Sequence, residues 1–228
     1  MTAPSEALQA GPPSAPPPLL AVAHGSREPE AALASEALVE AARRRLPGVD
    51  VTLAYIDFGS PSFAEARRRQ PYAVVVPLLL SRGTHTARDL PPEAVRPLGP
   101  DPRLTTALLG RIEQADIARG TALVLAASGT LDPGGLGDVA DQAGLLEQAW
   151  DAPVGAAFVT AAEPTVRAAR AAALAEHGAV AVVGYFLAPG RLPRASRAVT
   201  APLGDHAEVA ELVAERYRAG VSVLAGTG

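Results

Sequence analysis

Short apolar runs alternate with amphipathic segments along the first half of the chain. Runs at 19–23, 50–56 and 73–80 have the length and the Val and Leu content of buried strands. Segments 29–46 and 61–70 have helical spacing with proline in the first turn, and Ser60 would cap the second. This alternation predicts an α/β fold with a doubly wound parallel sheet. A further strand is expected at 103–108, followed by a short helix at 111–119.

The pattern begins again near residue 121. SGTLDP after the apolar run 122–127 aligns with HGSREP at 24–29, and AFVTAAEPTVRAAR (157–170) aligns with AYIDFGSPSFAEAR (54–67). VVGYFLAPGRL (182–192) aligns with VVPLLLSRGTH (75–85), and Leu203-Gly204 aligns with Leu109-Gly110. Ordered matches at nearly constant separation predict a tandem duplication. The predicted organisation is a disordered Pro-rich tail at 1–18, α/β repeats at 19–120 and 121–218 facing a central cleft, and a flexible tail at 219–228.

Composition narrows the classes of protein. Apolar residues make up 48% of 228, enough for a sizeable core, and a net charge of −4 without a long basic run argues against nucleic-acid binding. The absence of cysteine excludes disulfides and thiolate metal sites. No apolar stretch is long enough to span a membrane, and the N-terminus does not have the pattern of a secretory signal. We therefore expect a cytoplasmic protein without a membrane partner, and a monomer, since fused repeats already supply both walls of a cleft.

Candidate chemistry gathers at the predicted carboxyl ends of the strands in the first repeat. His24, His85 and Asp57 each follow a strand directly or within a short loop, and these ends meet at one edge of a parallel sheet. Imidazole binds Fe, Co, Ni, Cu and Zn and also accepts protons near neutral pH. The corresponding residues of the second repeat are Ser128, Leu192 and Thr160. We therefore predict a metal or proton-transfer site in the first repeat and a degenerate site in the second.

The loops around both histidines are basic and contain glycine, which suits a polycarboxylate or phosphate ligand. The candidate substrate-binding residues are Ser26, Arg27, Arg82, Gly83 and Arg88. Glu163 is a weaker candidate that either faces the cleft or caps a helix. His177 and His206 are expected to be ordinary surface or helix-end residues.

Three motifs together resemble the sirohydrochlorin chelatase family of the CbiX and SirB type, in its long two-repeat form. They are AHGSREPE (23–30), AYIDFGSPSF (54–63) and VVPLLLSRGTHTARDLP (75–91), and the resemblance extends over about 19–218. It implies an enzyme that inserts a divalent metal, Co²⁺ or Fe²⁺, into the anionic tetrapyrrole sirohydrochlorin, in sirohaem or cobalamin biosynthesis. The metal is then a substrate, and neither ATP nor an organic cofactor is needed.

The same resemblance assigns roles to individual residues. His24 and His85 correspond to the metal-site histidines of the family, where they would hold the metal and take up ring protons. Asp57 corresponds to an acidic residue that is usually glutamate, so its side chain is one methylene shorter. The basic residues would hold the substrate's carboxylates.

Other functions fit some of these features. The chain could insert another metal, such as Ni²⁺, or act on another tetrapyrrole. It could be a carrier that binds metal or tetrapyrrole without turnover. A periplasmic-type two-lobed binding protein also has α/β repeats around a cleft, although the short crossovers and the absence of a signal argue against it.

Overall fold

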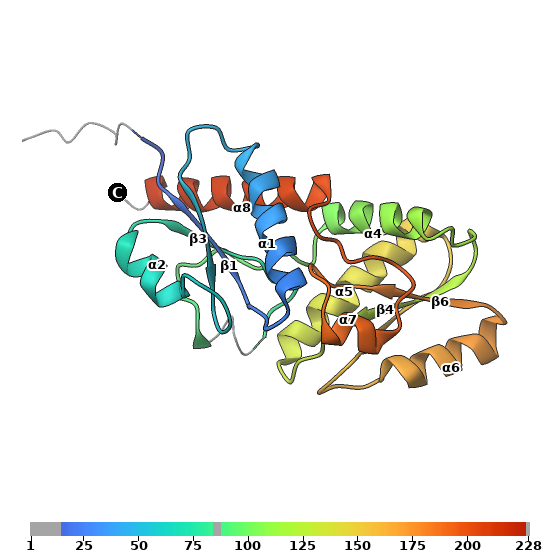
Figure 1. Ribbon diagram of the computed structural model, residues 1–228. Helices are drawn as coiled ribbons and strands as arrows, with labels where there is room; N and C mark the ends of the chain where they lie inside the picture. The colour runs from blue at the N-terminus through green and yellow to red at the C-terminus, as the bar shows by residue number, and fades with distance from the viewer. Residues whose placement is uncertain (1–14, 84–87, 227–228) are drawn as a thin grey trace, which may run out of the picture.

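The computed structural model describes residues 15–83 and 88–226 and has the predicted α/β architecture. The first sheet contains β1 (Leu19–Ala23), β2 (Val51–Tyr55) and β3 (Val74–Pro77) in the order β2-β1-β3. The second contains β4 (Ala122–Ala127), β5 (Val154–Phe158) and β6 (Val180–Gly184) in the order β5-β4-β6. All pairings are parallel. The same strand order in both sheets confirms the tandem repeat, and the two sheets form separate lobes (Figure 1).

Helices cover both faces of each sheet, as a doubly wound fold requires. The first repeat has α1 (Pro29–Arg43) and α2 (Phe63–Arg69), and the second has α5 (Pro133–Trp150), α6 (Val166–His177) and the short α7 (Arg191–Ser196). Alternate residues of β1 belong to different apolar clusters, Leu19 and Ala21 to the large central one and Leu20 and Val22 to a smaller one. The strand is therefore buried on both faces, which explains its unbroken apolar sequence.

Helix α2 (Phe63–Arg69) begins two residues later than expected, with Ser62 rather than Ser60 as its N-cap. The Ser62 hydroxyl accepts a hydrogen bond from the Glu65 backbone N–H, and the Glu65 carboxylate accepts one from the Ser62 N–H. This reciprocal capping box satisfies two helix-terminal donors, and Ser60 cannot form it because the residue three positions later is Phe63 rather than a glutamate.

Residues 102–114 form helix α4 (Pro102–Gln114), so the predicted strand at 103–108 is wrong. Asp101 caps the helix by accepting from the Arg103 N–H, and Pro102 occupies its first turn. Leu104, Leu108 and other apolar residues at helical spacing face the core. The capped helix start and the helical spacing of the leucines thus decide the structure, although the run of Leu and Thr at 103–108 suggested a strand.

Equivalent backbone hydrogen bonds in the two repeats change one of the sequence matches. Leu98 donates its N–H to Leu79, and Leu203 donates its N–H to Phe186, both at 2.8 Å. Each of these leucines is fully buried shortly before the closing helix of its repeat. Leu98-Gly99 therefore corresponds to Leu203-Gly204, whereas Leu109-Gly110 lies inside α4.

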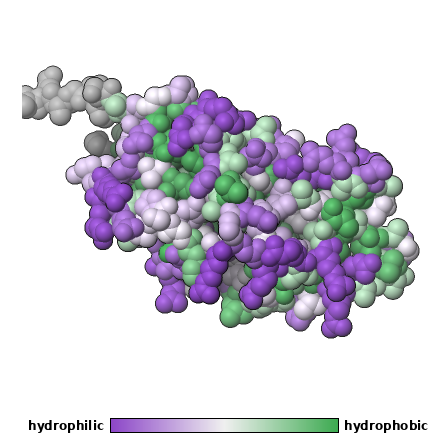
Figure 2. Space-filling view, viewed as in Figure 1, coloured by the Kyte–Doolittle hydropathy of each residue, from purple (hydrophilic) through white to green (hydrophobic). Residues whose placement is uncertain are grey.

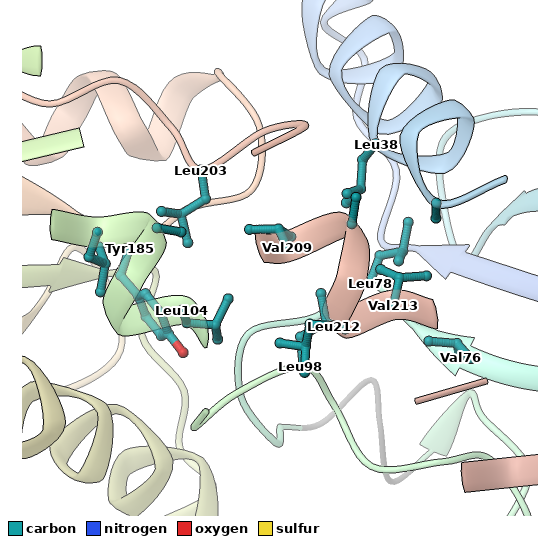
Figure 3. Packing of buried hydrophobic residues seen from close by; sticks show 14 of the residues in the cluster. Leu38, Val76, Leu78, Leu98, Leu104, Tyr185, Leu203, Val209, Leu212 and Val213 are labelled. Carbon is teal, nitrogen blue, oxygen red and sulfur yellow. The ribbon is translucent and has the colours of Figure 1, made fainter. Parts of the chain in front are cut away.

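The closing helices are exchanged between the repeats. Helix α4 packs against α5 of the second repeat, whereas α8 (Ala207–Gly226) packs against α1 and β3 of the first. Figure 1 shows α8 running from the second lobe back across the first. In Figure 3, Val209, Leu212 and Val213 of α8 lie between Leu38 on one side and Leu104 on the other. One continuous core therefore joins the two repeats.

Both predicted tails need correction where the structure describes them. Residues 219–226 are the end of α8, and a Cβ on Gly220 would lie 2.5 Å from Val74, so this turn is pressed onto β3. At the other end, the Tyr217 hydroxyl donates to the Pro17 carbonyl at 2.6 Å and the Val74 N–H to the Pro18 carbonyl at 2.8 Å. Residues 1–14 and 227–228 lie outside the described residues.

Candidate functional site

His24 and Asp57 meet at the carboxyl edge of the first sheet. His24 directly follows β1, and Asp57 follows β2, whose last residue Tyr55 is in register with Ala23. The Asp57 N–H donates to the His24 carbonyl at 2.9 Å, and the His24 Nδ1 lies 3.3 Å from the Asp57 Oδ2. The side chains are 48% and 42% exposed, so the pair is open to solvent and to a ligand.

Gly25 allows the two loops to approach each other closely. Its φ is +93°, and a Cβ there would lie 2.2 Å from the Phe58 carbonyl oxygen. The Ser26 N–H donates to the same oxygen at 3.2 Å, and the Ser26 hydroxyl accepts from the Glu28 N–H. The glycine of the His-Gly-Ser sequence therefore permits the backbone conformation that places His24 beside Asp57.

The second repeat reproduces this backbone without the ionisable groups. The Thr160 N–H donates to the Ser128 carbonyl at 2.9 Å, as Asp57 does to His24, and Gly129 has a φ of +105°. The Thr160 hydroxyl donates to the same carbonyl at 2.9 Å. The repeats thus share a scaffold, and the imidazole–carboxylate pair is found in the first repeat at this position.

A cleft of about 1040 Å³ lies between the repeats. His24, Arg27 and Phe58 line it from the first repeat, and Ser128, Leu131 and Leu192 are among its lining residues from the second. Asp57 is not among the lining residues, but it contacts His24, which is. Hydrophilic residues gather in Figure 2 over the lower middle of the view, where Figure 1 shows the starts of α1 and α5 close to α7.

The predicted basic residues take different positions. Arg27 lines the cleft with its guanidinium 4.5 Å from the centre of the Phe58 ring. Ser26 and Gly83 line it as well, whereas Arg88 is exposed and is not among its lining residues. His85 lies outside the described residues. The structure therefore brings His24, Asp57, Ser26, Arg27 and Gly83 to one region.

Arg82 joins the two repeats. Its Nη2 and Nε lie 2.6 and 3.0 Å from the carboxylate of Asp138 on α5, and its backbone N–H donates to the same carboxylate at 2.7 Å. The Asp138 side chain is 5% exposed, and its hydrogen bonds and charge raise the pKa of Arg82. Asp138 thus already neutralises the guanidinium of Arg82. The sequence-based prediction that Arg82 binds substrate stays a prediction.

The remaining candidates lie away from the cleft. The Glu163 carboxylate accepts from the Thr165 N–H at 2.8 Å and is not a lining residue. His177 is the exposed last residue of α6, and His206 precedes α8, where its Nδ1 accepts from the Glu208 N–H at 3.2 Å. Among the described residues, no group of three histidine, cysteine or acidic side chains gathers around a possible metal position.

Several cleft residues escaped the sequence analysis. Tyr185 lines the cleft with a buried hydroxyl that donates to the Leu80 carbonyl at 3.0 Å, and burial raises its pKa. Arg191 lines it from α7, and Asp138 lies behind it. Asp138 carried a usable signal, because it and Gln142 are polar residues four apart among the apolar residues that α5 buries.

Comparison with known proteins places this architecture. SirB from Bacillus subtilis with Fe³⁺ superimposes with a TM-score of 0.77 at 23% identity, covering 92% of this chain and 98% of that one. SirB from Bacillus subtilis subspecies spizizenii in complex with cobalt gives 0.74 at 21% identity, covering 92% and 97%. DR2241 from Deinococcus radiodurans, described as similar in structure to chelatases, gives 0.55 at 20% identity, covering 88% and 54%. Fold and site therefore define a two-lobed α/β protein with the chelatase-like fold.

The CbiX family matches residues 18–115 and 122–219, one match for each repeat. The chain belongs to the CbiX family, so the resemblance seen in its motifs is confirmed, and its class is that of a metal chelatase enzyme. A search of curated proteins finds no match. None of the helices in residues 15–83 and 88–226 has the length and apolar character needed to cross a membrane.

Proposed function

We propose that this protein is a sirohydrochlorin chelatase that inserts a divalent metal, Co²⁺ or Fe²⁺, into the macrocycle without ATP or an organic cofactor. The observation that carries the proposal is the His24–Asp57 pair, 3.3 Å apart, with His24 on the wall of a cleft of about 1040 Å³. Membership of the CbiX family and the superposition on SirB, in structures with iron and with cobalt, support it.

Two opposed walls suit a flat ligand. The wall of the second repeat includes the apolar side chains of Leu131, Ala161 and Leu192. Ligand pockets of drug-sized molecules are typically about 300–1000 Å³, so this open cleft accommodates a large ring. The macrocycle would lie with one face toward His24 and the other toward the apolar wall.

His24 and Asp57 would have different roles in handling the metal substrate. Because the Nδ1 of His24 faces the Asp57 carboxylate, that carboxylate favours the tautomer protonated at Nδ1. The metal would then be held through Nε2 of His24 together with His85. As the metal leaves Nε2 for the macrocycle, that nitrogen would be free to take up a ring proton, which then passes to water.

An anaerobic absorbance assay tests the function. Purified protein is mixed with sirohydrochlorin and Co²⁺, Fe²⁺ or Ni²⁺, and the spectral change is compared with the uncatalysed rate. We expect His24→Ala to abolish metallation while the protein stays folded. His177→Ala, which removes an exposed histidine at the end of α6, should keep full activity. Full activity of His24→Ala would refute the scheme.

The same assay separates the remaining alternatives. The order of metals decides between a role in sirohaem biosynthesis, which needs iron, and one in cobalamin biosynthesis, which needs cobalt. Tight binding of sirohydrochlorin without metallation by any of these metals would indicate a carrier. We further propose that the protein is cytoplasmic. We also propose that it is a monomer, since one chain supplies both walls of the cleft. Light scattering measures its mass.

A further inference from the structure

The ion pairs of the cleft divide its charged side chains into two groups. Glu28 accepts from Arg194 at 2.6 Å, and Arg82 is neutralised by Asp138. Arg27 and Arg191 also line the cleft, and no carboxylate among the described residues pairs with either guanidinium. The first lies in the loop after β1 and the second begins α7, so each repeat contributes one uncompensated positive charge.

The two charged loops are tied to each other. Arg27 directly precedes Glu28, and Arg191 lies one helical turn before Arg194. The Glu28–Arg194 ion pair therefore joins the two segments that carry the unpaired arginines. Arg27 is held further by stacking 4.5 Å from the Phe58 ring centre, which leaves the in-plane N–H groups of its guanidinium able to donate.

We propose that Arg27 and Arg191 are a two-point anchor that fixes a polycarboxylate ligand across the cleft, one carboxylate group at each repeat. The anchor deepens the proposed function, on which it rests, by adding Arg191 as a residue that sets substrate orientation. Arginine suits this role because its planar fork binds a carboxylate through two parallel hydrogen bonds.

Charge distribution supports an anionic ligand at this place. The chain as a whole has a net charge of −4. The two unpaired arginines therefore make the cleft locally positive on a protein that is negative overall, and this attracts anions to the cleft. The repeat comparison adds specificity. Leu131 occupies the position of Arg27 in the second repeat, whereas Arg191 occupies the position of Thr84 in the first. Each repeat therefore has its unpaired arginine on a different loop, which gives the cleft a polarity that orients the ring.

The test measures binding in the absence of metal, by absorbance titration with sirohydrochlorin and, separately, with uroporphyrin, a porphyrin with several carboxylate side chains. Arg191→Gln and Arg27→Gln should each weaken binding roughly tenfold, and the double variant roughly a hundredfold, because each removes one bidentate contact. Each variant should also lower the salt dependence of binding. Arg170→Gln, which removes an exposed positive charge of α6 outside the cleft, is the matched control and should bind as the wild type does.

In steady-state metallation, Arg191→Gln should raise KM for sirohydrochlorin much more than it lowers kcat, and Arg191→Lys should restore part of the loss. Variants that bind both tetrapyrroles as tightly as the wild type would overturn the anchor and leave the proposed function standing. Wild-type protein that binds uroporphyrin through these arginines yet does not metallate sirohydrochlorin would keep the anchor and overturn the function. Failure of the wild type to bind either compound would overturn both.

Discussion

In the proposed site, Asp57 would act through the imidazole of His24. Its carboxylate oxygen lies 3.3 Å from Nδ1, and its backbone N–H holds the His24 carbonyl at 2.9 Å. We infer that the carboxylate favours the tautomer protonated at Nδ1 and that the two contacts together orient the ring. Mutation of a carboxylate that hydrogen-bonds a metal-binding histidine typically lowers metal affinity or activity by about 10- to 100-fold.

Asp57→Asn should accordingly lower the rate of metallation by about 10- to 100-fold, because an amide can present either an N–H or a C=O to Nδ1 and so does not select one tautomer. Asp57→Glu should keep a larger part of the activity, since it retains the charge. The measurement is the initial rate of metal insertion by absorbance, with circular dichroism to establish the fold. An Asn variant as fast as the wild type would show that the Asp57 carboxylate is not needed for metallation and that the residue contributes only to the loop structure.

The positions of single residues were predictable where the place of the residue after a strand decides them. His24 and Asp57 followed from their places after parallel strands, and the structure brings them together. Arg82 shows the limit of such reasoning, because its partner Asp138 is distant in sequence and belongs to the other repeat. Arg191 was missed for a similar reason, since neither repeat alone shows which loop faces the cleft.

At the scale of elements, α8 begins with a pH-sensitive contact. The His206 Nδ1 accepts a hydrogen bond from the Glu208 N–H, which only a neutral imidazole can do. Burial, and then the nearby Arg111, lower the pKa of His206 below its usual value in the folded protein. The unfolded state thus binds the proton more tightly, so this contact stabilises the fold above pH of about 6.5 and is lost as pH falls through the lowered pKa.

We therefore expect the free energy of unfolding to fall between about pH 7.5 and pH 5 by up to about 1 kcal/mol through His206. His206→Asn keeps a cap that does not titrate and should reduce that difference. Urea denaturation of both proteins at the two pH values measures it. Equal pH dependence in wild type and variant would assign the effect to other groups.

The exchanged helices are held together by a buried ion pair. Arg216 of α8 lies 2.9 Å from the carboxylate of Asp101, which caps α4, and the side chains are 8% and 11% exposed. Arg216 also donates to the carbonyls of Pro97 and Leu98. Burial lowers the pKa of Arg216, although its hydrogen bonds to Asp101 act in the opposite direction.

Arg216→Met should destabilise the protein by about 3 kcal/mol, because the buried Asp101 carboxylate then keeps only its longer ion pair with the largely exposed Arg96, at 3.5 Å. Arg218→Met is the matched control two residues along the same helix. Its ion pair with Glu211 is half exposed, so we expect a loss of about 1 kcal/mol or less. Chemical denaturation measures both, and equal losses would show that the buried pair has no special weight.

The elements themselves were mostly predictable, since strand and helix periods differ and prolines mark the helix starts. The strand expected at 103–108 failed because a capped helix buries the same leucines. The exchange of α4 and α8 could not be predicted, because an apolar face shows that a helix packs but not against which sheet.

The whole molecule depends on that exchange for its stability. Helix α8 covers β3 and α1 of the first repeat, where Leu38 and Val76 are at most 1% exposed. Residues 15–120 alone would expose this surface, yet they contain α4, the counterpart of α8 in the duplication. Two copies of this half could therefore each place α4 on the other's sheet and restore the buried core.

We accordingly expect residues 15–120, expressed alone, to form a dimer rather than a folded monomer. Size-exclusion chromatography with light scattering measures the mass, with the full chain run beside it. Leu104→Asp in the half-chain places a charge on the apolar face of α4, where this leucine is fully buried in the full chain. It should abolish both dimer and fold, because burying an unpaired carboxylate is costly. A half-chain that stays monomeric with a cooperative unfolding transition would show that the first repeat has a core of its own and needs no exchanged helix.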